Sequence, residues 1–346
     1  MTGVELPFGD SLRSWWIDEL GSVHERPVDG AEPLPGRYVL PGLVDAHAHP
    51  TIAVGPSGPT GLDEAGTAAN LMAWAQTGVC LIRDVGSPAG SILELRVESG
   101  MPRIQAAGRF LAPAGHYFPN LLPEPVSEQD LITAAVAEVH RGAKWVKVIA
   151  DFPDLTAGTD AEPTYPIERI AELVAEAHKI GARVAVHSTI TNAGLLVAAG
   201  VDSIEHGIGL DEVAIADMAE RGTAWTPTVA ALSALLDSSD LPPARQQALL
   251  EGRQRVGELL PLAARLGVPI LAGTDVTGSI PQEVALLASL GLEPQDAIAA
   301  ASVWPRQFLG VETEVADLVT YHHDPRHDPG ELTRPAAVLV DGKRIR

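Results

Sequence analysis

Cysteine is almost missing from this chain, since Cys80 is the only one among 346 residues. A single thiol cannot form a disulfide within the chain, so we expect a protein suited to the reducing cytoplasm. Cys80 lies in an apolar run with a strand-like pattern. We therefore predict that it packs in the core rather than acting as a nucleophile.

Long hydrophobic runs and a basic leader are also missing. No window approaches the roughly 18 uninterrupted apolar residues of a membrane-spanning helix, so we expect none. The first residues, Met1–Leu6, contain no basic segment and no long apolar stretch. We therefore predict no signal peptide.

Basic residues are scarce relative to acidic ones. Lys and Arg number 24 and Asp and Glu number 45, which gives a formal net charge of −21. Phosphate backbones would repel a chain this acidic, so we expect no nucleic-acid partner. We interpret the acidity as a contribution to solubility rather than as the mark of a cationic substrate.

The most informative feature that is present is a pair of histidines, His47 and His49, after the apolar run 38–44. Side chains alternate between the two faces of a strand, so both imidazoles point the same way. They would lie about 6–7 Å apart along the strand, which suits a metal ion placed between them. Because such a pair is common by chance, its meaning depends on further ligands elsewhere in the chain.

Short apolar runs alternate with longer amphipathic ones from residue 38 onward. We predict strands at 38–45, 79–84, 103–108, 145–150, 183–188, 202–206, 224–228 and 269–274. Among the helical patterns between them, one begins after Pro166 and stops at Gly181, and another covers about 243–266. Eight strands that alternate with helices indicate parallel βα units.

The fold class that fits this pattern is α/β, with a (β/α)8 TIM-type barrel over residues 38–309, because such barrels take roughly 250 residues. An open doubly wound sheet would need a Gly-rich phosphate-binding turn after an early strand, and the sequence has none there. Residues 1–37 and 310–346 have a different composition and contain short apolar pieces at 318–321 and 337–340. We predict that the two chain ends pair as one small β domain beside the barrel.

Four more chemically active side chains fall on the later predicted strands. Lys147 lies inside an apolar run, His187 and Asp275 each end one, and His206 ends the predicted strand 202–206. Catalytic groups of such barrels sit at the C-terminal ends of the strands, so these residues should converge with the first histidine pair. Each has an ordinary alternative when taken alone: a core or surface histidine, a lysine that reaches solvent, or a turn-capping aspartate. Their joint occurrence favours a metal centre.

In combination and in order, these segments resemble the amidohydrolase superfamily, in the branch of imidazolonepropionase-like and prolidase-like enzymes. The resemblance covers nearly the whole chain. The segments that carry it are Leu40–His49, Thr77–Val79, Arg83–Gly86, Gly142–Val148, Val186–Ser188, Ser203–Gly207, Ala272–Asp275 and Ala316–Val319.

The resemblance implies a site for two zinc ions, with other divalent metals as alternatives. One ion would be bound by His47, His49 and Asp275, and the other by His187 and His206. Lys147 would bridge both ions as a carbamate formed with CO2, which turns a cationic side chain into an anionic oxygen ligand. Asp275 would also accept the proton of the attacking water and pass it to the leaving amine.

Candidate substrate contacts come from the loop after the third predicted strand, which resembles the family's Gly-Gly-His loop. His116 in this loop, with Tyr117 beside it, could donate a hydrogen bond to the substrate carbonyl, although a surface-loop histidine fits the sequence as well. Arg109 could bind a substrate carboxylate, but a surface charge fits better. We expect Arg83 to form an inward structural ion pair rather than to contact substrate.

A second group of histidines lies near the C-terminus, at His322, His323 and His327. Asp-Pro pairs at 324–325 and 328–329 surround them. This context is typical of turns, so we predict a turn-rich loop rather than a second metal site.

The sequence thus predicts a metal-dependent amidohydrolase that acts on a dipeptide, an N-acyl amino acid or a cyclic amide. A one-metal imidazolonepropionase-like or deaminase-like enzyme and a lactone or ester hydrolase stay open as alternatives. A non-catalytic relative that keeps the barrel as a scaffold is disfavoured, because all six ligand positions are filled. We expect a small-molecule substrate and no membrane partner, and we leave homo-oligomer formation open.

Overall fold

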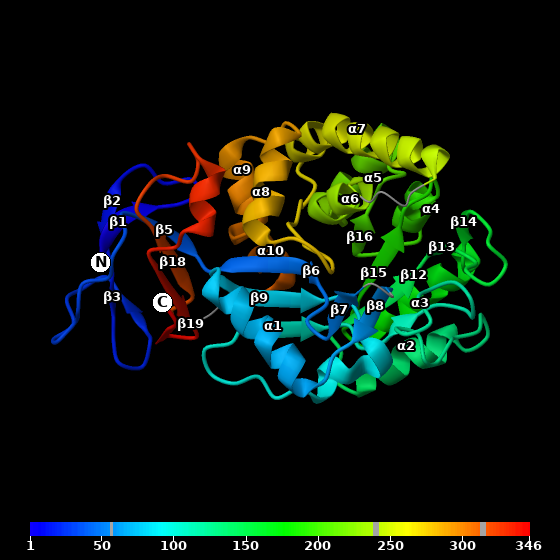
Figure 1. Ribbon diagram of the computed structural model, residues 1–346, viewed down its shortest axis with the longest axis horizontal. Helices are drawn as coiled ribbons and strands as arrows, with labels where there is room; N and C mark the ends of the chain where they lie inside the picture. Colours follow the sequence, from blue (N-terminus) through cyan, green and yellow to red (C-terminus); the bar gives the residue numbers. More distant parts are fainter. Residues whose placement is uncertain (56–57, 238–241, 312–315) are drawn as a thin grey trace.

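The computed structural model describes residues 1–55, 58–237, 242–311 and 316–346, which form a mixed α/β fold (Figure 1). No helix within these ranges combines the length and the hydrophobicity needed to cross a bilayer. The helices of the described residues are α1 (Glu64–Gln76), α2 (Leu131–His140), α3 (Ile167–Lys179), α4 (Ala193–Ala198), α5 (Glu212–Arg221), α6 (Val229–Leu236), α7 (Pro243–Leu266), α8 (Ile280–Ser289), α9 (Pro294–Ala300) and α10 (Val303–Leu309).

Parallel strands form two sheets at the centre of the molecule. The first has the order β10 (Arg103–Ala106), β9 (Val79–Asp84), β6 (Leu43–Ala48). The second has the order β11 (Phe110–Leu111), β12 (Trp145–Ile149), β15 (Arg183–Ser188), β16 (Ser203–His206), β17 (Ala224–Thr226). Strands β6, β9 and β12 are buried along their whole length, as expected for parallel strands covered on both faces.

The segment 269–275 lies between β17 and β6 and contacts both. Isolated bridges pair Ile270 with Trp225 and Asp275 with Ala48. The strand predicted at 269–274 is therefore present only as separate bridges. The reason is that its N–H groups have different partners, since Leu271 donates to Trp225 of β17 whereas Ala272 donates to Ala300 at the end of α9.

The strand predicted at 38–45 is divided in two at Gly42. Its first part, β5 (Tyr38–Pro41), pairs with β18 (Leu318–Tyr321), and its second part is β6, which pairs with β9. The backbone passes so close to β9 at this point that a Cβ on Gly42 would lie 2.2 Å from the Cys80 sulfur. Cys80 itself is fully buried in the core, as predicted.

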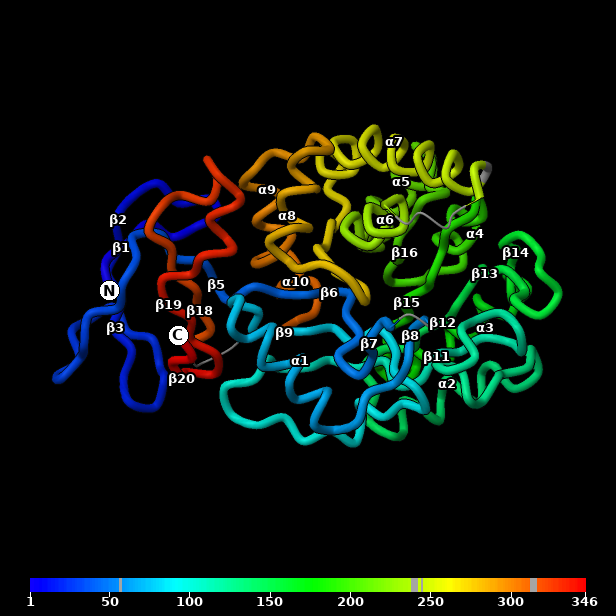
Figure 2. Tube along the Cα trace, in the orientation of Figure 1, coloured from blue at the N-terminus to red at the C-terminus, as the bar shows by residue number. Residues whose placement is uncertain are grey.

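Both chain ends contribute to one sheet, which lies at the opposite end of the molecule from the hairpin of β13 (Asp151–Pro153) and β14 (Ala161–Pro163) (Figure 2). Its order is β2 (Leu12–Ser14), β1 (Thr2–Glu5), β5, β18, β19 (Ala337–Val340), β20 (Lys343–Arg344). The remaining strands form three hairpins: β3 (Trp16–Ile17) with β4 (Val23–His24), β7 (Ile52–Gly55) with β8 (Gly58–Gly61), and β13 (Asp151–Pro153) with β14 (Ala161–Pro163).

The two helices singled out in the sequence are confirmed. Helix α3 lies between Pro166 and Gly181, as predicted, and buries Ile170, Leu173, Val174 and Ala177. Helix α7 spans the predicted 243–266, and Gly267 ends it in a left-handed conformation, with a φ of 82°. In Figure 1 the arrows of β6 and β9 point toward the β7–β8 and β13–β14 hairpins, so the C-terminal ends of these strands lie at that end of the molecule.

Candidate metal centre

Four histidines from three strands meet at the C-terminal ends of those strands. His47 lies in β6, His49 follows it, and His187 and His206 lie in β15 and β16. Their ring centroids are 5.3 Å apart for His47 and His49, 5.0 Å for His47 and His206, and 4.6 Å for His187 and His206. Side chains that are up to 159 residues apart in the sequence therefore form one cluster.

Asp275 joins this cluster from the segment between β17 and β6. Its Oδ1 lies 3.4 Å from His49 Nε2 and 4.0 Å from His47 Nε2. One ligand atom from each of these three residues lies within 4.8 Å of the others, a spacing that could hold a metal ion. Asp275 and His206 both adopt a left-handed backbone, with φ of 60° and 68°, which is the kind of strain that collects at functional sites.

Hydrogen bonds from Nδ1 orient three of the four imidazoles. His47 Nδ1 lies 2.7 Å from Glu205 Oε2, and His49 Nδ1 lies 2.7 Å from the backbone oxygen of Gly86. A carboxylate or carbonyl oxygen only accepts, so both rings carry their proton on Nδ1. In each ring the lone pair of Nε2 is then available to a metal ion.

His206 is held in the same way by a threonine. Its Nδ1 lies 2.7 Å from Thr228 Oγ1, and that hydroxyl donates its own proton to the Pro227 backbone oxygen at 2.8 Å. The hydroxyl oxygen therefore accepts from His206 Nδ1, which again places the free lone pair on Nε2. Thr228 reaches this position because its own backbone is left-handed, with a φ of 48°.

Burial keeps the cluster neutral and shifts the protonation of Asp275. It lowers the pKa of His49 to about 4, and it lowers those of His47, His187 and His206 well below the usual value, with a further contribution from Lys147 in each ring. Burial also raises the pKa of Asp275 to about 6, partly opposed by the charge of Lys147. Neutral imidazoles are the form that binds metal, and a carboxyl that titrates near neutrality can exchange protons.

Lys147 of β12 is a buried amine beside this cluster. It is 1% exposed, and its Nζ has no hydrogen-bond partner within the described ranges. Burial lowers its pKa to about 8, although the charges of Glu205 and Asp275 oppose the shift. A buried ammonium without a close counter-ion is costly, so the site favours a form of this side chain that is not a bare cation.

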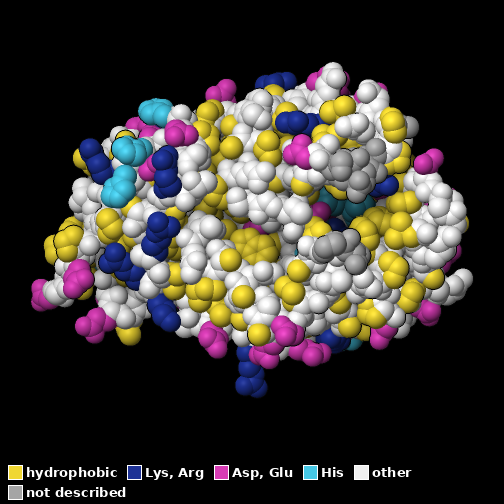
Figure 3. All heavy atoms as spheres, viewed as in Figure 1, with side chains coloured by type: hydrophobic (Ala, Val, Ile, Leu, Met, Phe, Trp, Pro, Cys, Tyr) yellow, Lys and Arg dark blue, Asp and Glu magenta, His cyan; other side chains and the backbone are white. Residues whose placement is uncertain are grey.

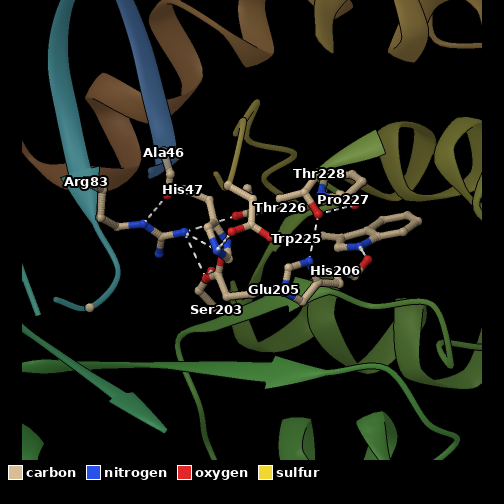
Figure 4. Close-up of polar contacts among 12 residues, drawn as sticks. Ala46, His47, Arg83, Ser203, Glu205, His206, Trp225, Thr226, Pro227 and Thr228 are labelled. Carbon is tan, nitrogen blue, oxygen red and sulfur yellow. Dashed lines mark hydrogen bonds and ion pairs between the residues drawn. The ribbon is translucent and has the colours of Figure 1, made fainter. Parts of the chain in front are cut away.

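A buried ion pair lies beside the histidine cluster (Figure 4). Arg83 of β9 donates from Nη2 to both carboxylate oxygens of Glu205, at 2.8 and 3.0 Å, and to Thr226 Oγ1 at 3.0 Å. Its Nε donates to the backbone oxygen of Ala46, next to His47. The inward structural ion pair predicted for Arg83 is therefore confirmed, and its partner Glu205 is also the residue that orients His47.

Replacing Glu205 should weaken both the fold and metal binding. A Glu205→Gln variant leaves the Arg83 guanidinium buried without its counter-charge, so we expect the free energy of unfolding to fall by about 3 kcal/mol. It also weakens the orientation of His47, which should lower zinc affinity by about 10–100-fold. Urea denaturation of the metal-free protein and a zinc titration measure the two effects.

Glu220→Gln is the matched control for this prediction, because it makes the same charge change at an exposed position of α5. It should change neither quantity. A Glu205→Gln protein as stable as the control would show that the ion pair contributes little to the fold.

Two glycines let the backbone approach the cluster closely. Gly86 has a φ of 128°, and a Cβ there would lie 2.5 Å from the Phe110 ring. A Cβ on Gly273 would lie 2.5 Å from the Cβ of His47. Both positions thus require glycine. Gly86 supplies the carbonyl that orients His49, and Gly273 lets the Asp275 segment approach β6.

The three candidate substrate residues differ in their burial and in their hydrogen-bond and ion-pair partners. Arg109 pairs with Glu124 at 2.5 Å and with Glu138 at 3.3 Å, an arrangement in which its charge is already satisfied by the chain. The half-buried His116 has its Nδ1 3.1 Å from the Phe152 backbone oxygen. Tyr117 is 9% exposed, and the charge of Asp275 together with burial raises its pKa.

The second histidine group lies away from the cluster, on the surface. His322, His323 and His327 are exposed in the turn-rich segment after β18. Within the described ranges, the only group of three or more possible ligands with metal-like spacing is His47, His49 and Asp275.

Sequence reasoning missed three residues that hold the ligand candidates in place. Glu205 is an acid in strand β16 directly before His206, and Asp45 is an acid inside the buried strand β6, so their types were a usable signal. Asp45 accepts from the Thr274 amide at 3.1 Å and from its hydroxyl at 2.6 Å, which ties β6 to the Asp275 segment. Thr228 carried no such signal, because its role depends on a left-handed backbone.

One family model matches most of the chain, and one relative is similar over nearly its whole length. The family model described as the amidohydrolase family matches residues 38–344. An uncharacterized protein of Mycobacterium tuberculosis (strain H37Rv) is 35% identical over 359 residues, which cover 99% of this chain and 94% of that protein.

Two solved structures show the same fold at lower identity. A prolidase complexed with N-methylphosphonate-L-proline is 23% identical, with a TM-score of 0.77, and the match covers 96% of this chain and 93% of that one. A Xaa-Pro dipeptidase with methionine bound in its active site is 24% identical, with a TM-score of 0.72, and the match covers 89% of this chain and 86% of that one.

Proposed function

This chain belongs to the amidohydrolase family, and from that premise we propose that it is a metal-dependent hydrolase that cleaves an amide-type carbon–nitrogen bond. The observation that carries the proposal is the cluster of four histidines, Asp275 and Lys147 at the ends of neighbouring strands. We propose a dipeptide, an N-acyl amino acid or a cyclic amide as substrate, and the names of the prolidase and the dipeptidase add support for the dipeptide.

The residues present fit a pair of divalent metal ions, which we propose to be zinc. Three imidazoles keep their protons on Nδ1 and so offer Nε2, and burial keeps all four rings neutral. We assign His47, His49 and Asp275 to one ion. We assign His187 and His206 to the other.

Lys147 favours the two-metal version over a one-metal, imidazolonepropionase-like or deaminase-like version. Its Nζ lies among the ligand candidates without a hydrogen-bond partner in the described part of the chain. With a pKa of about 8, part of the amine is uncharged near neutral pH and can react with CO2. The resulting carbamate would carry anionic oxygens and could bridge both ions.

Bound metal ions would supply Lewis-acid chemistry, which lowers the pKa of a water molecule and polarises a carbonyl group. Asp275 accepts a proton from the water that attacks the substrate carbonyl carbon, because its carboxylate lies beside His47 and His49 at the candidate metal centre. As the carbon–nitrogen bond breaks, Asp275 returns this proton to the leaving amine. Glu205 and Thr228 keep the rings of His47 and His206 in place throughout.

His116 stays a candidate for a hydrogen bond to the substrate carbonyl. Its Nδ1 donates to the Phe152 backbone oxygen, which leaves Nε2 without a proton in the neutral ring. His116 would therefore act as a donor from Nε2 only in its charged, imidazolium form.

We also propose that the parallel strands close into an eight-stranded (β/α)8 barrel over residues 38–309, with a small β domain from 1–37 and 310–346. The bridges from Ser87 to Arg109, Trp225 to Ile270 and Ala48 to Asp275 support closure, because they join the sheet edges and the segment between them. The pairing of β5 with β18 supports a first crossing between the two proposed units near Gly42.

A hydrolysis screen of zinc-loaded protein tests the proposed function. We expect turnover of at least one compound among dipeptides, N-acyl amino acids, cyclic amides and lactones, loss of that turnover on chelation, and recovery when zinc is added back. Elemental analysis should find about two zinc ions per chain, as expected for a two-metal site.

The other outcomes are equally informative. Turnover of lactones alone would show that the bond cleaved is an ester rather than an amide. One zinc ion per chain with full activity would favour the one-metal version. A folded protein that binds no zinc and cleaves none of these compounds would contradict the proposal and favour a scaffold role.

A further inference from the structure

Four aromatic side chains form a continuous wall beside the candidate metal centre, and we call them the aromatic wall: Phe110, Tyr117, Phe118 and Phe152. Phe110 lies in β11, Tyr117 and Phe118 follow it in the next loop, and Phe152 lies in β13. Neighbouring ring centroids are 4.8–5.5 Å apart, so the rings pack directly on one another.

The aromatic wall contacts the candidate ligands themselves. The Phe110 ring lies 5.4 Å from that of His49, and the Phe152 ring lies 5.7 Å from that of His187. Val276, the residue after Asp275, packs against the same cluster. A group bound near both His49 and His187 would therefore meet these rings.

Part of the aromatic wall is open to solvent. Phe118 is 38% exposed, and Phe152 and Val276 are half-buried. Figure 3 shows this face hollowed over the ends of β15 and β16, with histidine side chains inside the hollow and hydrophobic side chains along the rim nearest β13. Apolar rings that stay exposed next to a polar cluster offer a surface for an apolar part of a ligand.

The charges around the aromatic wall favour an uncharged ligand group. Arg109, the arginine nearest to it in sequence, is paired with Glu124 and Glu138. Lys147 lies among the ligand candidates, and Tyr117 faces the charge of Asp275 rather than a cation. A substrate carboxylate placed against these rings would lose its hydration without gaining a guanidinium partner.

We propose that the substrate carries an uncharged aryl or bulky alkyl group next to the scissile amide, and that this group packs on the aromatic wall. This inference rests on the proposed hydrolase function and names its substrate class. A neutral aromatic amide would bury its ring against Phe118 and Phe152, while its carbonyl group lies beside the candidate metal centre.

Four matched amides test the proposal with zinc-loaded protein. N-Benzoylglycinamide has a ring on the acyl side, N-acetylbenzylamine has one on the amine side, N-acetylglycinamide has none, and N-benzoylglycine replaces the neutral amide end with a carboxylate. We expect kcat/KM for at least one of the two neutral aryl compounds to exceed that of N-acetylglycinamide by tenfold or more. N-Benzoylglycinamide should also be cleaved faster than N-benzoylglycine.

Phe118→Ala provides the variant, because this side chain is exposed enough to be removed without opening the core. We expect it to lower kcat/KM for the preferred aryl amide by about tenfold and to leave that of N-acetylglycinamide within twofold. Phe8→Ala is the matched control, since Phe8 is 53% exposed and lies in the terminal segment that precedes β2. It should change neither value.

Two results would overturn the inference while leaving the hydrolase function intact: a preference for N-acetylglycinamide over both neutral aryl compounds, or an equal loss for all substrates in Phe118→Ala. If none of the amides is cleaved, the proposed function fails on this panel, and calorimetric binding of N-benzoylglycinamide decides the inference separately. Binding that Phe118→Ala weakens and Phe8→Ala does not would support the aromatic wall as the binding surface. Absent or unchanged binding would reject it.

Discussion

An Asp275→Asn variant is expected to keep its zinc and to lose turnover by about 10³-fold. The amide has the size of the carboxylate and still offers one oxygen near His49, where Oδ1 of Asp275 lies 3.4 Å from Nε2. It cannot accept a proton from the attacking water, however, whereas burial places the pKa of Asp275 at about 6. The measurements are kcat with the best substrate of the screen and the zinc content of the same preparation.

The comparison of turnover with metal content separates the two roles assigned to Asp275. Asp160→Asn makes the same change at an exposed position before β14 and should leave both quantities unchanged. If turnover and zinc disappear together, Asp275 acts as a ligand and its role in proton transfer is unsupported. If turnover persists within about threefold, far less than general-base loss produces, another group accepts the proton.

The candidate ligands could be located from the sequence because each one lies in or at the end of a predicted strand. A buried strand admits a histidine, lysine or aspartate only where the side chain has a partner, so such residues mark the ends of strands that meet. His187 and His206 illustrate this, since each ends a predicted strand and their rings lie 4.6 Å apart in the structure. Local patterns were enough here because parallel strands bring the same ends together.

Other features depended on contacts between distant segments and had no local pattern. The division of 38–45 at Gly42 follows from the approach of Cys80, and the broken pairing of 269–275 follows from the contact of Ala272 with α9. The pairing of Arg109 with Glu138 depends on how α2 packs beside β11. Alternation of apolar and polar residues carries no information about such neighbours.

The residues that hold the candidate ligands in place could be predicted only in part from the sequence. Glu205 has the unusual type that marked the ligands, but its partner Arg83 is 122 residues away and its hydrogen bond to His47 spans 158. A sequence can indicate that such a charge needs a partner, whereas the identity of the partner comes from the order of the strands. β6, β9 and β16 all have to be in place before Ala46, Arg83 and Glu205 can meet (Figure 4).

A Lys147→Met variant should lose both its zinc and its activity, with turnover reduced by about 10³-fold or more because the hydroxide-generating metal site is incomplete. Methionine fills the same buried space in β12 and removes an amine that has no hydrogen-bond partner within the described residues. The free energy of unfolding of the metal-free variant should therefore exceed that of the metal-free wild type by about 1 kcal/mol or more. Zinc content, kcat and urea denaturation test the three parts.

Metal binding by the wild-type protein should also depend on CO2, because a carbamate forms from CO2 and a neutral amine. Metal-free protein reloaded with zinc in CO2-depleted buffer should bind less metal than protein reloaded with bicarbonate, and Lys147→Met should show no such difference. Lys144→Met, an exposed neighbour three residues earlier, controls for loss of a lysine and should behave as wild type. Full zinc loading and turnover in Lys147→Met would show that this side chain is not a ligand, and the two-metal assignment would then lose its bridge.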